Sequence, residues 1–143
     1  VCSSDLVTFE STGQMVADSA EPVTVFGQEG DVWISSSTMI MYTEDGGESF
    51  QTVKTLPTVD SIGFGKGKEE DSYPVIYAEG DDGENGYGIY RSEDKGKSWI
   101  RINDEQHKFG NLNPKYITGD SNVYGRVYFC TDGRGIVMGD IAS

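Results

Sequence analysis

The sequence predicts an all-β fold, and three observations support this prediction. Apolar residues occur in short or alternating runs that are bounded by Gly, Asp, Asn and Ser, which is typical of strands joined by tight turns. No segment of a dozen residues carries the apolar stripe of an amphipathic helix. An octapeptide of one pattern occurs twice along the chain, 49 positions apart.

The expected strands fall into three series along the chain. The first comprises Leu6–Glu10, Met15–Ala17, Val23–Phe26, Met39–Thr43 and Ser49–Val53. The second comprises Ile62–Phe64, Val75–Ala78, Gly88–Ser92 and Ser98–Ile102. The third comprises Tyr116–Thr118, Arg126–Phe129 and Ile136–Gly139.

The internal repeat narrows the fold. Thr43–Phe50 and Ser92–Trp99 both read Ser/Thr-x-Asp-x-Gly-x-Ser-aromatic, and upstream Pro22–Asp31 is matched with Pro74–Asp81. A repeat of about 40–50 residues that holds four strands is typical of the blade of a β-propeller. We therefore expect a partial β-propeller of two to three four-stranded antiparallel blades, with blades at about 13–56 and 58–104 and an incomplete one over 105–143.

The octapeptide is an Asp-box, and its expected role is structural. The Asp carboxylate accepts hydrogen bonds from amides of its own turn, the Gly permits a positive φ, and the aromatic packs under the hairpin. A calcium loop is the alternative, but the pattern fixes only one carboxylate in each turn. The structural positions are Thr43, Asp45, Gly47 and Phe50 in the first copy and Ser92, Asp94, Gly96 and Trp99 in the second.

Composition excludes some classes of partner. Of 143 residues, 24 are acidic and 11 are basic, so the net charge is −13. This charge opposes binding to nucleic acid or to anionic membranes, and no apolar run is long enough to span a bilayer.

Cys2 and Cys130 allow one disulfide bridge at most, and whether they pair stays open. The start has no targeting signal; Val1–Leu6 resembles a translated sequencing adapter of metagenomic reading frames and is expected to be a non-native leader.

The C-terminal third resembles the carboxyl end of family 74 glycoside hydrolases, the xyloglucanases. The resemblance rests on Tyr90–Asn111, Ile117–Asp120, Val123–Tyr128 and Thr131–Ile136, and it extends over about Gly13 to Ile141. Enzymes of this family resemble a pair of seven-bladed propellers with xyloglucan in the cleft between them. They are inverting, secreted endo-β-1,4-glucanases that use two aspartates.

The resemblance implies that this chain lacks the catalytic pair, because the family positions of both aspartates lie upstream of the matched segment. It implies a neutral β-glucan or xyloglucan partner, which exerts no electrostatic pull on an acidic protein. Two to three blades cannot close a propeller ring, which typically contains four to eight blades. We therefore expect self-association, or association with missing upstream blades.

Three loops are expected on the face of the blades that would lie toward the glycan: Gly30–Thr38, Asp81–Tyr87 and Asp104–Pro114. Within them, Trp33, Tyr87 and His107 are the candidate substrate contacts, because aromatic rings stack on sugars and imidazole bonds to hydroxyls. The alternatives are that Trp33 is a core residue of an extra strand, that Tyr87 only begins the next strand, and that His107 anchors its loop.

Other functions remain as alternatives. Asp81, Asp82 and Glu84 are a possible calcium site, although clustered acids are usually solvated turn residues. A sialidase would need three convergent arginines, and Arg91 and Arg101 lie at opposite ends of adjacent expected strands. The chain is alternatively a stand-alone glucan-binding or assembly module, or a hydrolase that uses Asp81 with Asp104 or Asp120.

Overall fold

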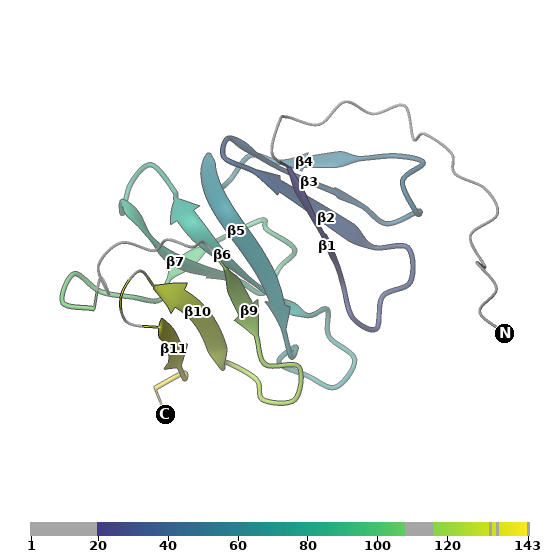
Figure 1. The fold of residues 1–143 in the computed structure, drawn as a ribbon. Helices are drawn as coiled ribbons and strands as arrows, with labels where there is room; N and C mark the ends of the chain where they lie inside the picture. The colour runs from purple at the N-terminus through teal and green to yellow at the C-terminus, as the bar shows by residue number, and fades with distance from the viewer. Residues whose placement is uncertain (1–19, 108–115, 132, 134, 143) are drawn as a thin grey trace, which may run out of the picture.

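The computed structural model describes residues 20–107, 116–131, 133 and 135–142, and within them all regular secondary structure is β (Figure 1). The strands form three antiparallel sheets, which we call the first, second and third blade. The first blade contains β1 (Glu21–Thr24), β2 (Val32–Ser36), β3 (Met39–Thr43) and β4 (Gln51–Val53). The second contains β5 (Thr58–Gly65), β6 (Val75–Asp81), β7 (Tyr87–Ser92) and β8 (Ile100–Arg101). The third contains β9 (Ile117–Gly119), β10 (Val127–Thr131) and β11 (Gly135–Gly139).

The all-β prediction is confirmed, and in each blade the strands pair in the order of the sequence. The expected strands Leu6–Glu10 and Met15–Ala17, the leader Val1–Leu6 and Cys2 lie outside the described residues. Cys130 lies on β10 with its side chain half-buried.

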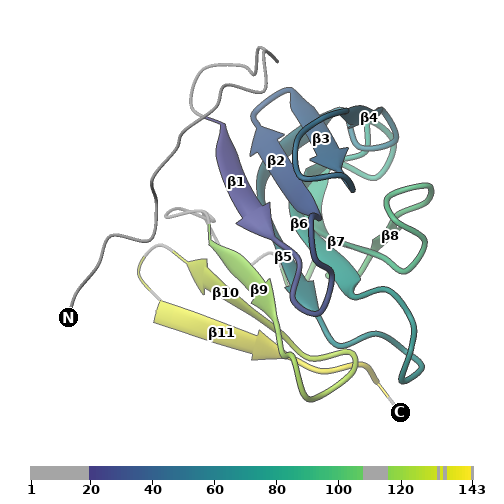
Figure 2. The same ribbon diagram turned by 90° about the vertical axis from the view of Figure 1, so that its right-hand side faces the viewer.

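The first strands of neighbouring blades lie next to one another, and β5 contacts both β1 and β9 (Figure 2). Glycines permit this approach. A Cβ atom on Gly63 would lie 2.2 Å from the carbonyl oxygen of Ile117, and one on Gly65 would lie 2.9 Å from the Cα of Gly119. Because no side chain fits in this gap, the glycines determine how closely the second and third blades meet.

The second strand of the first blade corrects the sequence analysis. Val32–Ser36 forms β2, whereas these residues were expected within the loop Gly30–Thr38. The match of Pro22–Asp31 with Pro74–Asp81 is wrong, because Pro22 lies in a first strand while Pro74 precedes a second strand. The true counterpart of β6 is β2.

The strand pairing explains the error, because connections of unequal length change the offset between blades. Corresponding residues of the first and second blades are 40 positions apart in their first strands, 44 positions apart in their second strands and 49 positions apart in their octapeptide turns. These pairs are Val23 and Gly63, Trp33 and Tyr77, and Thr43 and Ser92.

Two apolar clusters hold the blades together. One lies between the first and second blades and contains Trp33; the other lies between the second and third blades and contains Tyr77 and Phe129. These three aromatic residues lie on the second strands of the three blades and are buried. Burial of such large apolar surfaces is the main force that keeps the blades stacked.

The two octapeptide turns have the same hydrogen bonds. In the first, Asp45 accepts bonds from Ser49 N and from the Thr43 hydroxyl, at 2.9 and 2.7 Å, and Thr43 Oγ1 accepts one from Gly47 N at 2.9 Å. In the second turn, Asp94 accepts bonds from Ser98 N at 2.9 Å and from the Ser92 hydroxyl at 2.8 Å. Ser92 Oγ in turn accepts a bond from Gly96 N at 2.9 Å. Gly47 and Gly96 have φ values of +98° and +77°. In both turns the aspartate thus accepts hydrogen bonds from its own turn and the glycine has a positive φ.

Each octapeptide turn also bonds to the blade that follows. The acidic residue at its second position is Glu44 in the first turn and Glu93 in the second. Glu44 accepts a hydrogen bond from Lys95 Nζ, and Glu93 accepts one from the Tyr124 hydroxyl at 2.6 Å. Lys95 also lies 4.2 Å above the centre of the Tyr73 ring. One position of the repeat thus fastens two successive boundaries between blades.

Candidate functional site

The connections divide between the two ends of the strands. We call one end the loop face; it carries the β2–β3 turn, the β6–β7 turn, and the connections from β4 to β5 and from β8 to β9. The other end, which we call the octapeptide face, carries the two octapeptide turns and the β1–β2 and β5–β6 connections. Ligands of β-structures usually contact such loop clusters rather than the strands.

Tyr87, at the start of β7, lies on the loop face with 40 % of its surface exposed. Its hydroxyl donates to Asp60 Oδ2 over 2.7 Å, and its carbonyl oxygen accepts a bond from Arg101 Nη2. Partial burial, together with the bond to the negative Asp60, raises the pKa of the Tyr87 phenol. The ring is therefore neutral, fixed in place and partly accessible.

The acidic turn beside Tyr87 uses its carboxylates internally. Asp81 accepts a bond from Gly83 N at 2.7 Å, and Asp82 accepts bonds from the backbone and side chain of Asn85 at 2.7 and 2.6 Å. Burial raises the pKa of Asp82, but the bonds from Asn85, from Glu84 N and from the Tyr90 hydroxyl outweigh it and lower the pKa to about 2. Within the described residues no group of three potential ligands could hold a metal ion, so the calcium hypothesis gains no support.

His107 lies on the connection after β8, and its side chain is 63 % exposed. Its Nδ1 is 2.6 Å from Asp104 Oδ1, and its main-chain N–H donates to the same oxygen. Asn103 Nδ2 donates to the His107 carbonyl, while Asn103 Oδ1 accepts a bond from Ile89 N. The loop that carries His107 is thus tied to β7, the strand that begins with Tyr87.

Arg101 connects the same two segments. Its Nη1 donates to the carbonyl oxygen of Asn85 and to Glu105 Oε1, both at 2.8 Å. The structure therefore ties together, at the loop face of the second blade, the segments that carry two of the three predicted contacts, Tyr87 and His107. The sequence did not indicate that Arg101 and Asn103 link them.

Trp33 is a correction. It was predicted to stack on a sugar, but it lies in β2 with none of its surface exposed. Its ring stacks on Tyr42 with centroids 4.6 Å apart and meets Phe64 edge to face, and Nε1 donates to the Tyr73 hydroxyl. All of its faces are used within the protein, so it is the core residue that the sequence left as the alternative.

Tyr116 is an aromatic residue of the loop face that the sequence analysis did not select. It directly precedes β9 and is 59 % exposed. It was counted as part of a strand, and only its exposure in three dimensions indicates a contact. Phe26, which is 42 % exposed, follows β1 and lies on the octapeptide face.

The chain resembles known glycoside hydrolases in sequence and structure. It is 43 % identical over 125 residues to a xyloglucanase of Acetivibrio thermocellus, a match that covers 82 % of this chain and 14 % of that protein. The GH74 xyloglucanase structure from Xanthomonas campestris superposes with a TM-score of 0.79 at 32 % identity, covering 93 % of this chain and 19 % of that one. The structure of the GH74 enzyme from Niastella koreensis superposes with a TM-score of 0.77 at 37 % identity, and the match covers 86 % of this chain and 18 % of that one. No family model matches.

The chain belongs to glycoside hydrolase family 74. The resemblance seen in the sequence is confirmed, and so is the fold as a partial propeller of antiparallel blades. This family 74 chain spans only 14 % of the length of the xyloglucanases that it matches.

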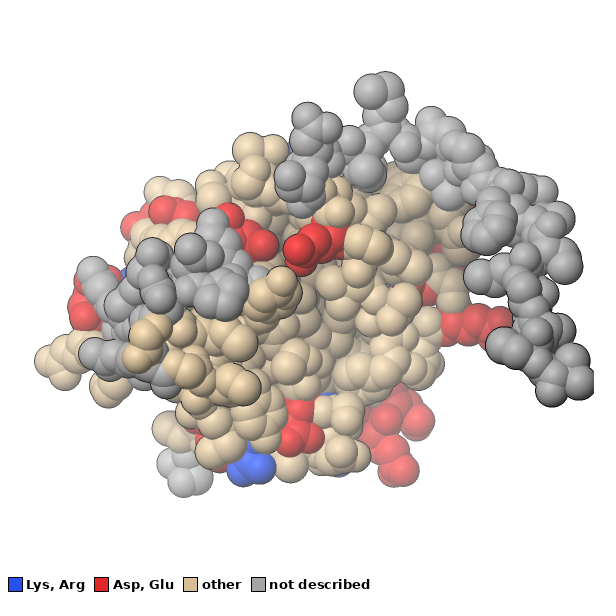
Figure 3. Space-filling view, in the orientation of Figure 1, with Lys and Arg blue, Asp and Glu red and all other residues tan. Residues whose placement is uncertain are grey.

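The face of the family 74 chain that Figure 3 shows carries more acidic than basic side chains. Acidic side chains form separate patches with little basic charge between them on the face shown in Figure 3. Among the described residues, no helix is long and apolar enough to cross a membrane.

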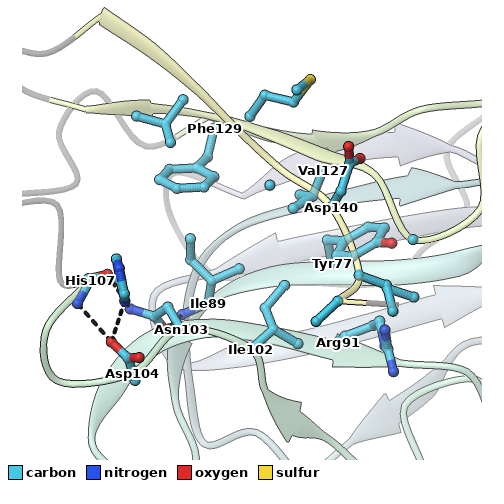
Figure 4. A pocket seen from close by; sticks show the side chains of 16 residues that line it. Tyr77, Ile89, Arg91, Ile102, Asn103, Asp104, His107, Val127, Phe129 and Asp140 are labelled. Carbon is cyan, nitrogen blue, oxygen red and sulfur yellow. Dashed lines mark hydrogen bonds and ion pairs between the residues drawn. The ribbon is translucent and has the colours of Figure 1, made fainter.

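A cavity of about 540 Å³ lies between the second and third blades (Figure 4). Its walls are mainly apolar, with Ile89, Val127 and Phe129 among them, and Asp104 and His107 lie at one end. The cavity therefore adjoins the loop of His107, but its apolar lining differs from the exposed polar surface around Tyr87.

Proposed function

We propose that the chain is a C-terminal part of a secreted, xyloglucan-specific endo-β-1,4-glucanase-like protein of the inverting type, with the catalytic aspartates outside this segment. The observation that carries the proposal is the 43 % identity to a xyloglucanase over 82 % of the chain. In this proposal the octapeptide turns are Asp-boxes that stabilise the blades, and catalysis depends on the rest of the longer protein.

The hydrogen bonds of the candidate acids support the absence of a catalytic pair. An inverting hydrolase needs one carboxylic acid with a raised pKa and a carboxylate about 6.5–9.5 Å away. A hydrogen bond from His107 lowers the pKa of Asp104, and the backbone N–H of Asn122 lowers that of Asp120. Asp81, Asp104 and Asp120 all accept bonds from amides of their own turns, which suits structural roles.

Glycan contact is proposed for the loop face, through Tyr87 and His107. Tyr87 offers a ring whose hydroxyl is held by Asp60 and whose main-chain carbonyl is held by Arg101, so little side-chain entropy is lost when a sugar stacks on it. His107 lies on a loop tied to the same strand. Tyr116, which precedes the first strand of the third blade, is a further exposed aromatic ring on this face.

Affinity electrophoresis in gels containing xyloglucan tests this proposal. We expect retardation of the unmodified chain, and about fivefold to tenfold weaker binding for Tyr87→Ala, since loss of an aromatic anchor costs about 1 kcal/mol. Phe26→Ala is the matched control, because it removes an equally exposed ring from the opposite face. Equal retardation of both variants would exclude Tyr87 as a platform.

Release of reducing sugar from xyloglucan tests the catalytic part separately. We expect none from the chain alone. Release that Asp104→Asn abolishes would instead support a hydrolase with its own acids.

The open array of blades is also proposed to associate with a second copy or with missing blades. A clean monomer by light scattering at every concentration would contradict self-association.

A further inference from the structure

Asn85 is exposed on the turn between β6 and β7, directly before Gly86 and Tyr87. Of the asparagines in the sequence, it alone is followed by glycine. This dipeptide has a chemistry of its own, because the main-chain nitrogen after an asparagine can attack the carbonyl carbon of the asparagine side chain. Glycine leaves that nitrogen unhindered, since it carries no Cβ atom.

The Gly86 nitrogen is open to such a reaction. Within the described part of the chain its N–H donates no hydrogen bond, so no bond has to break before it reacts. A Cβ atom on Gly86 would have nothing within 4 Å, so there is space beside this peptide bond for a ring. The nucleophile is therefore unpaired and unhindered among the residues that the structure describes.

Other bonds of similar chemistry are blocked by hydrogen bonding. The described segments contain two Asp–Gly bonds, which can form the same kind of ring. The nitrogen of Gly46 donates to the Gly30 carbonyl oxygen at 3.0 Å. The nitrogen of Gly83 donates to Asp81 Oδ1 at 2.7 Å. Both turns would have to open before these nitrogens could react.

Asn122 provides a second comparison, because it is also exposed in an acidic turn. The residue after it is Val123, whose branched side chain crowds the nitrogen. The Val123 N–H also donates to Asp120 Oδ1 at 3.1 Å. The two asparagines therefore share exposure and an acidic turn but differ in the nitrogen that would attack.

The side chain and main chain of Asn85 hold the turn together. Nδ2 donates to Asp82 Oδ2 at 2.6 Å, and the main-chain N–H donates to Asp82 Oδ1 at 2.7 Å. The Asn85 carbonyl oxygen accepts a bond from Arg101 Nη1 at 2.8 Å. A change at Asn85 would therefore act both on its own turn and on the link to β8.

We propose that Asn85 is a site of spontaneous deamidation and that its product releases the turn beside Tyr87. Gly86 N loses its proton and bonds to Asn85 Cγ, and the Cγ–Nδ2 bond breaks, so that ammonia leaves with that proton. Water then opens the succinimide ring at either carbonyl and leaves an aspartate or an isoaspartate. The net reaction exchanges ammonia for water and adds one negative charge, and water is its only co-reactant.

Both products disturb the turn. An aspartate replaces the donor that faces Asp82 with a second carboxylate, and two like charges at this distance repel each other. An isoaspartate also routes the main chain through the former side chain, which adds one backbone atom before Tyr87. The modification itself is independent of glycan binding; only its effect on glycan contact rests on the proposed function.

Peptide mapping of the aged full chain tests the modification. The folded protein is kept in mildly alkaline buffer, which favours loss of the proton from Gly86 N, and samples are digested with trypsin. Cleavage after Lys and Arg releases residues 69–91 and 116–126, whose only asparagines are Asn85 and Asn122. We expect the first peptide to gain about 1 Da at least tenfold faster than the second. Equal rates at the two sites would overturn the proposal.

Amide hydrogen exchange tests the release of the turn. We expect the Tyr87 and Gly88 amides to exchange faster in the aged chain than in the fresh one. Asn85→Gln is the matched control, because its longer side chain keeps the amide but closes a ring far more slowly. Ageing should leave its exchange unchanged. Unchanged exchange in fully deamidated protein would overturn the effect on the turn.

Affinity electrophoresis in xyloglucan gels separates this inference from the proposed function. Ageing should weaken retardation of the unmodified chain but not that of Asn85→Gln. A fresh chain that is not retarded would contradict glycan binding, while the peptide masses would still decide the deamidation. Equal retardation of fresh and fully deamidated chains would overturn the effect of the modification on glycan contact.

Discussion

Gly63 on β5 lies so close to Ile117 on β9 that a Cβ atom would come within 2.2 Å of the Ile117 carbonyl oxygen. The contact is between two backbones, so no rotamer change can relieve an added methyl group. The inner edges of the second and third blades therefore meet at a distance that only glycine permits.

Gly63→Ala is expected to destabilise the chain by about 1–3 kcal/mol, because the blades must separate to admit the methyl group. Urea unfolding followed by tryptophan fluorescence measures the loss. Gly139→Ala is the control, since its Cβ would lie at an ordinary 3.5 Å from a Val127 methyl. Equal stability of the two variants would contradict a tight contact at Gly63.

Ser92→Ala is expected to cost about 1–3 kcal/mol. The buried Ser92 hydroxyl donates to Asp94 and accepts the Gly96 N–H, so alanine leaves a buried donor unsatisfied. Ser92→Thr should keep nearly full stability, because Thr43 makes the same bonds in the first turn. A threonine variant as unstable as the alanine variant would show that packing rather than hydrogen bonding matters.

Trp99 and Thr55 are expected to be energetically coupled across the blade boundary. Trp99→Phe and Thr55→Val each remove one end of the 2.9 Å hydrogen bond, and their double-mutant cycle should give about 0.5–1 kcal/mol of coupling. Denaturant unfolding of the two single variants and the double variant supplies the cycle. Strict additivity would mean that the bond adds nothing to the association of the blades.

Stability should fall as the solution becomes acidic, and Asp82 should account for part of the loss. Its pKa is about 2 in the folded chain against an ordinary 3.8, so the folded state binds fewer protons over this interval. The stabilisation is present above about pH 4 and is lost as the pH falls through about 2. Unfolding midpoints at about pH 5 and pH 3 should differ less for Asp82→Asn than for the unmodified chain. Asp71→Asn, at an exposed site, is the control.

The local parts of the fold were predictable because their determinants are local. Each octapeptide satisfies its own hydrogen bonds within eight residues, so the pattern specified the turn and the strands beside it. β2 was missed for the opposite reason: the five residues Val32–Ser36 have little periodicity, and unequal connections shifted the repeat by 4 or 5 positions from one strand to the next.

The candidate site was predictable only in part. Tyr87 adjoins a marked acidic turn, which the sequence displays, but the burial of Trp33 depends on Tyr73, 40 residues further along the chain. Tyr116 precedes a short strand, and nothing in its neighbours along the chain distinguishes an exposed ring from a buried one. Contacts between blades decide exposure, and they are not encoded in any single segment.

The fastening of Glu44 by Lys95 and of Glu93 by Tyr124 uses one acceptor position with two different donors. The acceptor, a glutamate of the octapeptide turn, therefore recurs in each preceding blade. The donor from the following blade differs between the two boundaries. A gene duplication that copied one whole unit would carry a ready acceptor into every new junction, and any nearby cation or hydroxyl could complete it. Such an array can lengthen or shorten by whole units while its older junctions stay intact.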